Sequence, residues 1–241
     1  MKPTLLLSNN VLPSFERTET KDWGNFMAKT NSTITVYESL KDKILRGVYS
    51  PSASLPEVEL ANEYNVSRNT IKKALLMLEN DSYVTIEMNK GAKVRSYSSQ
   101  EVLDYLQLRV ELEGFITRLA VPCITEAQFQ RLEGIVTQMC QRQEAGDLMG
   151  YSALNQQFHA IIYDACPNKT ATEILIKLKQ QMRKYNMKTI LVPGRDTHSL
   201  QEHKAILDAI RIQDAAAAEA AVRRHVESVR ETFERNLALL F

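Results

Sequence analysis

Three of the four histidines in this 241-residue chain lie on the apolar faces of three different predicted helices, where they can hold a metal ion. Asn155 precedes His159 by four residues, so both side chains project from one helix face. His203 and His225 each lie among apolar residues at helical spacing. Imidazole-rich sets favour zinc, nickel, copper or cobalt over magnesium or calcium. Taken singly, however, a histidine in a core is more often a buried polar residue than a ligand.

A second group of side chains has the chemistry needed to contact DNA. Arg68 can donate two hydrogen bonds to guanine, and Asn69 has the groups that match adenine. The side chains suited to phosphate contact are Ser67, Thr70, Lys72 and Lys73. The segment 67–73 carries three positive charges and no negative one. A solvated helix face is the alternative, but the elements around this segment favour DNA binding.

Those elements predict a winged helix-turn-helix over residues 33–96. The pair Thr35 and Glu38 forms a capping box that is expected to begin the first helix, whose apolar stripe is Val36, Leu40, Ile44 and Val48. The second and third helices are expected at 57–64 and from the Ser67 cap to about residue 81. The expected buried stripe of the third helix is Ile71, Leu75 and Leu78. Two strands, 83–87 and 92–95, follow as a hairpin, the wing. Its connection carries Lys90 for phosphate contact and Gly91, which tolerates a positive φ.

The remainder, residues 97–241, predicts a second domain without strands. Its capping boxes begin at Ser98, Thr125, Thr170 and Ser199. Together with the helix-breaking residues they indicate six helices, at 99–121, 125–146, 148–166, 169–191, 199–212 and 214–239. The fold class is therefore mainly α, a winged helix-turn-helix followed by an all-α antiparallel helical bundle. Residues 1–32 are expected to form a flexible arm, and His198 is expected to lie in a solvated loop before the fifth of these helices.

Composition limits the function classes. A net charge of +1 gives no overall attraction for a polyanion, so DNA contact must come from a local basic patch. The three cysteines have no paired spacing, which fits a reducing compartment and an expected cytoplasmic location. No apolar run is long enough to cross a bilayer, so no membrane partner is expected.

The DNA-contacting segment resembles a known family. Residues 55–75 (LPEVELANEYNVSRNTIKKAL), with the wing at Gly91, look like the winged helix of GntR-superfamily regulators. That family usually has Arg-Glu where this chain has Lys72 and Lys73. Lysine keeps the positive charge but lacks the planar fork of arginine, so Lys72 is expected to anchor phosphate and not to read a base.

The helical half resembles the FCD ligand-binding domain of the FadR-type branch, in its six-helix VanR-like form. The resemblance lies in residues 109–113 (RVELE), 155–161 (NQQFHAI), 202–206 (EHKAI) and 224–226 (RHV), and it covers about residues 33–235 in all. It implies a divalent metal, most often zinc or nickel, held by Asn155, His159, His203 and His225. Most relatives have Asp where this chain has Asn155, an amide that ligates more weakly. The resemblance also implies that Arg109 binds an effector carboxylate, although a helix pair with Glu113 explains Arg109 equally well.

The resulting hypothesis is a homodimeric transcriptional regulator that binds double-stranded operator DNA and responds to a small carboxylate effector. A metal-free bundle that binds an apolar or acyl ligand is one alternative. A metal-dependent hydrolase is another, but no carboxylate in the matched motifs is an obvious general base, so the chain is not expected to be an enzyme.

Overall fold

The computed structural model describes residues 20–88, 90–182, 185 and 189–240, with only the backbone course given for residues 20–31. The chain divides into two compact units. One comprises residues up to 42 together with 54–92, and the other comprises 43–53 together with 93–241.

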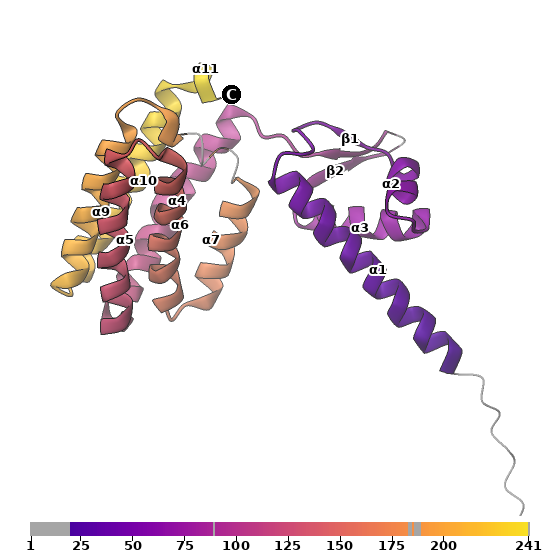
Figure 1. Ribbon diagram of the computed structural model, residues 1–241, viewed down its shortest axis with the longest axis horizontal. Coiled ribbons are helices and arrows are strands. Elements are labelled where there is room, and N and C mark those ends of the chain that lie inside the picture. Colours follow the sequence, from indigo (N-terminus) through magenta and orange to yellow (C-terminus); the bar gives the residue numbers. More distant parts are fainter. Residues whose placement is uncertain (1–19, 89, 183–184, 186–188, 241) are drawn as a thin grey trace, which may run out of the picture. The chain divides into compact units, whose positions relative to one another are not determined.

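The N-terminal unit confirms the winged helix-turn-helix (Figure 1). Its elements are α1 (Thr20–Leu45), β1 (Ser54–Leu55), α2 (Glu57–Glu63), α3 (Arg68–Asn80), β2 (Val84–Glu87) and β3 (Gly91–Val94). The strands form one sheet in the order β1-β3-β2, so β1 adds a third strand that the sequence did not indicate. The predicted stripe of α3 is buried, with Ile71, Leu75 and Leu78 at most 1% exposed.

The first helix is longer than predicted. It begins at Thr20, so Thr35 lies inside the helix instead of capping it, and part of the expected arm, residues 20–32, is helical. The stretch from residue 20 to residue 45 contains no proline, and nothing else there forces the helix to start late. The helix ends at Leu45, which leaves Val48 outside it and 63% exposed, although the sequence placed Val48 on the buried stripe.

The C-terminal unit is a helical bundle (Figure 1). Its main helices are α4 (Ser99–Ala120), α5 (Glu126–Glu144), α6 (Leu148–Ala165), α7 (Lys169–Gln181), α9 (Arg195–Arg211) and α10 (Ala215–Arg235). Shorter pieces are α11 (Leu237–Leu240) and the 3-10 turns η1 (Val121–Cys123) and η2 (Thr189–Leu191). Capping boxes at Ser98 and Thr125 start α4 and α5 as predicted.

Three boundaries in this unit differ from prediction. Helix α7 ends at Gln181, short of the expected 191. Helix α9 begins at Arg195 because Gly194, at φ 80°, supplies the chain reversal, so His198 is exposed but lies inside a helix and not in a loop. The last helix is interrupted at Asn236, whose φ of −122° is not helical.

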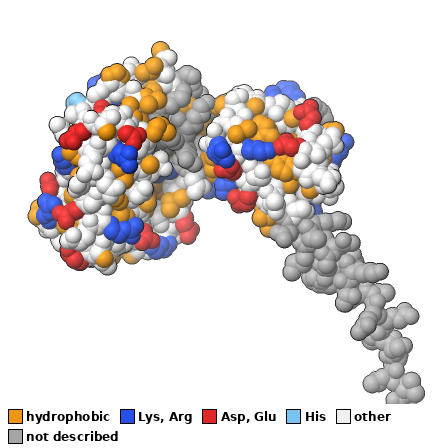
Figure 2. Space-filling view, viewed as in Figure 1, with side chains coloured by type: hydrophobic (Ala, Val, Ile, Leu, Met, Phe, Trp, Pro, Cys, Tyr) orange, Lys and Arg blue, Asp and Glu red, His pale blue; other side chains and the backbone are white. Residues whose placement is uncertain are grey.

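Helices α4 and α10 pack along each other and form much of the bundle interior. Their buried apolar residues include Ile116, Val222 and Val226, each fully buried. In Figure 2 the lysine, arginine and acidic side chains are interspersed on the visible face of this unit, in agreement with the small net charge. Within the described residues, no helix is both long and apolar enough to span a bilayer.

Candidate metal centre and DNA-contacting surface

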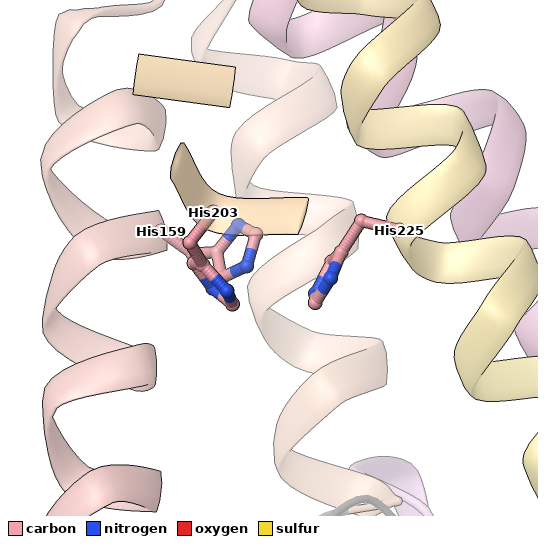
Figure 3. Close-up of side chains that lie close together, drawn as sticks. All are labelled: His159, His203 and His225. Atoms are coloured by element: carbon pink, nitrogen blue, oxygen red, sulfur yellow. The ribbon is translucent and has the colours of Figure 1, made fainter. Parts of the chain in front are cut away.

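The three predicted histidines converge inside the bundle. His159 on α6, His203 on α9 and His225 on α10 point toward one another in Figure 3, and each offers a nitrogen within 4.8 Å of those of the other two. Their exposed fractions are 3%, 0% and 2%. Three helices therefore bring together residues that are up to 66 positions apart in the sequence.

Two of the rings are held by groups behind them. His203 Nδ1 donates to the carbonyl oxygen of Ser199 at 2.6 Å. His225 Nδ1 donates to Glu202 Oε2 at 2.7 Å, and Arg195 Nη2 donates to the same oxygen at 2.8 Å. A hydrogen bond from Nδ1 leaves the Nε2 lone pair of each ring for a metal ion, which is the usual way that a protein orients histidine ligands.

The other polar atoms of the cluster belong to His159 and Asn155. Both ring nitrogens of His159 are buried without a hydrogen-bond partner among the described residues. Asn155 Oδ1 lies 2.9 Å from His203 Nε2, and two acceptors face each other there when Nδ1 carries the proton. A cation bound by Asn155 Oδ1 and His203 Nε2 would remove this repulsion, because both atoms would then act as its ligands. The chemistry of this donor set therefore fits a divalent transition metal.

Burial keeps the three rings neutral at physiological pH. Desolvation is the largest cause in each case, and it lowers the pKa of His203 to about 3. Burial and the nearby Lys179 ammonium lower the pKa of His159 well below its usual value. Burial likewise lowers the pKa of His225, although Glu202 acts in the opposite direction. Neutral imidazoles can bind a metal without first losing a proton.

A charged network lies beside the histidines and is centred on Glu113, which is fully buried. Its Oε1 accepts from Arg109 Nε at 2.6 Å and lies 3.6 Å from Lys179 Nζ. Its Oε2 accepts from the Tyr163 hydroxyl at 2.6 Å and lies 3.7 Å from His159 Nδ1. Burial alone would raise the pKa of Glu113, but the two cations hold it well below its usual range.

A cavity of about 920 Å³ opens between helices α4, α6, α7 and α10 and reaches the histidine cluster. Its lining includes Arg109, Asn155, His159, Lys179 and His225. Arg109 thus borders the cavity as expected of an effector-binding residue, and it also makes the alternative helix pair with Glu113. The two interpretations of Arg109 are compatible, because an arginine has five donors.

The expected DNA-contacting residues lie at the start of α3 and on the wing. Ser67, Arg68, Asn69, Lys72 and Lys73 are exposed, as are Lys90 and Gly91 on the wing. Gly91 has the expected positive φ, 81°. Lys90 Nζ lies 3.0 Å from the Glu87 carboxylate, and Arg68 Nη2 lies 3.6 Å from that of Glu57. Both cations would have to share or exchange these partners on binding phosphate or a base.

Thr70 differs from its neighbours. It is only 8% exposed, and its hydroxyl lies 2.9 Å from Ser67 Oγ. Ser67 Oγ also accepts from the Thr70 amide at 3.1 Å and so caps the helix. This placement gives Thr70 a part in holding the turn, and it weighs against the predicted phosphate contact by its side chain.

Sequence reasoning missed three polar residues of the cavity region. Tyr163 follows His159 by four residues, so helical spacing could have placed it on the ligand face. Lys179 on α7 and Arg195 at the start of α9 carry no such signal, because their partners Glu113 and Glu202 are recognised only in the folded chain.

Comparison with known proteins places this chain among bacterial regulators. The family described as bacterial regulatory proteins, gntR family, matches residues 33–94, and the FCD domain family matches residues 104–228. The HTH-type transcriptional repressor RspR of Escherichia coli K12 is 24% identical over 197 residues, which cover 82% of this chain and 86% of the repressor. The galactonate operon transcriptional repressor of the same organism is 25% identical over 219 residues, with 82% and 95% covered.

A solved structure supports the same fold. E. coli McbR/YncC superposes with a TM-score of 0.64 at 21% identity, covering 87% of this chain and 96% of that one. The FCD match alone extends over more than half of the sequence, and the winged region accounts for most of the rest. The chain therefore belongs to the GntR family of bacterial regulatory proteins and carries an FCD domain.

Proposed function

We propose that this regulator binds operator DNA through α3 and the wing, and that a small organic acid in the bundle cavity controls its affinity for that DNA. The observation that carries the effector site is the buried histidine cluster, which borders a cavity large enough for a small molecule. The exposed cationic turn of α3 supports the DNA site.

The residues that would hold the metal are Asn155, His159, His203 and His225, and zinc or nickel suits them best. A bound divalent ion would supply a positive centre that attracts a carboxylate. Ser199 and Glu202 orient the rings of His203 and His225. Glu113 holds Arg109 beside the cavity through an ion pair. A neutral Asn155 in place of an aspartate leaves the centre one unit more positive, which favours an anion.

The route from effector to DNA follows from connectivity. Strand β3 ends at Val94 and α4 begins at Ser99, so α4 joins the wing to a wall of the cavity through a short linker. In a homodimer, which the family resemblance implies, operator affinity depends on the spacing of the two recognition helices. An effector that prefers one bundle arrangement would shift that spacing and the affinity with it. A cytoplasmic location is part of the same proposal.

The test begins with DNA selected by the protein from a random pool, used as the operator in fluorescence anisotropy. Protein loaded with zinc or nickel, and protein treated with chelator, would each be titrated against DNA in the presence of a panel of carboxylic acids. We expect at least one acid to change operator affinity about fivefold or more, the lower end of usual coupling energies, and only in the metal-loaded protein. An equal response after chelation would contradict the metal-dependent site.

The two alternatives have less support in the geometry. A metal-free bundle that binds an acyl chain would place apolar surface against the Arg109, Glu113 and Lys179 network and leave His159 unpartnered. For a hydrolase, the relatives reported above carry names of transcriptional regulators and give no support.

A further inference from the structure

Lys179 enters the cavity from α7 with donor capacity to spare. Its side chain is about a quarter exposed (24%), and its Nζ donates to the Tyr163 hydroxyl at 2.8 Å. The next contact of Nζ is the ion pair with Glu113 Oε1 at 3.6 Å, which is longer than a hydrogen bond. An ammonium has three N–H groups. Among the described residues, one of the three therefore has a hydrogen-bond acceptor, and Lys179 lines the cavity.

In the part of the cavity around Lys179, two cations share one buried carboxylate. Glu113 is shared by Arg109 and Lys179. Arg109 Nε is the closer of the two, at 2.6 Å from Glu113 Oε1, whereas Lys179 Nζ lies at 3.6 Å. Burial lowers the pKa of Lys179 to about 8 while Glu113 acts against this shift, so the amine is still mostly protonated at pH 7. One carboxylate compensates one of two cations, and a divalent ion on four neutral ligands would add two further positive charges.

Acidic residues elsewhere in the lining do not cancel this excess. Asp164 and Glu173 line the cavity, but both are exposed, and the equally exposed Lys169 lies with them. Water and salt screen charges in such positions far more than charges in the interior. A ligand that reaches the histidine cluster therefore meets a positive centre there and a second cation at Lys179.

We propose that the effector is a dicarboxylic acid, with one carboxylate at the histidine centre and the other at Lys179. This inference rests on the proposed function, because it specifies which acids the site prefers. A monocarboxylic acid of the same length would place a methyl group against the Lys179 ammonium and leave it with only the Glu113 carboxylate that it shares with Arg109. The cavity volume of about 920 Å³ leaves room for a ligand with a carboxylate at each end.

The experiment compares acids that differ only in the second carboxylate. Isothermal titration of zinc-loaded protein at pH 7 would measure succinate against butyrate, glutarate against pentanoate, and adipate against hexanoate. We expect the diacid to bind at least tenfold more tightly than its monoacid for one or more of these lengths. In Lys179→Met that ratio should fall below threefold, while the affinity for the monoacid changes less than threefold.

Two variants separate selectivity from folding. Lys179→Arg keeps the charge and should keep the preference for the diacid. Lys177→Met removes an exposed lysine of the same helix that does not line the cavity, and it should behave as wild type. Zinc content and circular dichroism would be recorded for each variant.

The outcomes distinguish this inference from the proposed function. Equal or tighter binding of the monoacid at every length, or a diacid preference that persists in folded Lys179→Met, would overturn the dicarboxylate assignment and leave the carboxylate effector site intact. Failure of every acid to bind the zinc-loaded protein would overturn both.

Discussion

The DNA-contacting turn of α3 and the histidine cluster of the bundle differ in how their positive charges are compensated. At the start of α3, Lys72 and Lys73 are neighbouring exposed cations in a segment without a carboxylate, where water solvates them until phosphate arrives. Beside the histidine cluster, Arg109 and Lys179 are held against the fully buried Glu113. Unpaired charge costs little at a surface and much in an interior. Substitutions in the bundle are therefore expected to have larger effects than those on the DNA-contacting turn.

The largest effect should come from Glu113→Gln. The substitution keeps the size of the side chain but leaves Arg109 and Lys179 without their counter-ion, and breaking a buried ion pair in this way costs roughly 3–5 kcal/mol. Chemical denaturation of chelator-treated protein would measure the loss in free energy of unfolding. Glu111→Gln is the matched control on the same helix: its side chain is 65% exposed and pairs with Arg223, so the expected loss is about 1 kcal/mol or less. Equal losses would mean that burial of Glu113 does not set its contribution.

The second effect concerns metal binding. His159→Ala removes the ring whose two nitrogens have no partner among the described residues. Losing a group behind a ligand typically lowers metal affinity 10–100-fold, and we expect the loss of this ligand to lower zinc affinity by roughly 100-fold or more. Competition with a chromophoric chelator would measure the affinity. His198→Ala, which changes an exposed histidine of α9, should bind zinc as wild type does. Unchanged zinc binding in His159→Ala would remove His159 from the ligand set.

Much of the fold could be predicted from the sequence, because local signals set it. The Ser67 cap, the buried stripe of α3 and the capping boxes at Ser98 and Thr125 are all where the sequence placed them. Local signals failed where two of them competed. The capping box at Thr35 does not begin a helix, because the helix already runs from Thr20. The capping box at Ser199 does not begin α9, because the chain turns at Gly194 and the helix starts at Arg195.

The histidine cluster was predicted only through resemblance and helical faces, whereas the contacts of Lys179 in its charged surroundings were not predicted. Each contact of Lys179 joins α7 to another helix: Tyr163 lies on α6 and Glu113 on α4. Such contacts depend on how helices pack and on side-chain direction, which the periodicity of a single helix does not contain. The pairing of Arg109 with Glu113, in contrast, follows from spacing within one helix.

On the DNA side, Arg68→Ala should have an effect of intermediate size. Loss of a bidentate contact to guanine costs roughly 1–3 kcal/mol in operator affinity and relaxes the preference at that base pair. Anisotropy titrations with the selected operator and with single-base variants would measure both quantities. Arg235→Ala, a 75% exposed arginine of the C-terminal unit, serves as the control. If Arg68→Ala weakened every sequence equally, Arg68 would be a phosphate contact.

The smallest effect is expected from Lys72→Met, and it should differ in kind from that of Arg68→Ala. A lysine that neutralises one phosphate contributes about 0.9 to the slope of log affinity against log salt, whatever the base sequence. The substitution should therefore lower the slope by about that amount and weaken operator and unrelated DNA alike, by a few-fold at moderate salt. Lys204→Met, at an exposed position on α9, should leave the slope unchanged. A loss confined to the operator would show that Lys72 reads a base, and an unchanged slope would place Lys72 away from the phosphates. The first result would weaken the contrast between the two sites, because the charge of Lys72 would then act through specific pairing, as the charge in the cavity does. The second would remove Lys72 from the DNA-contacting surface.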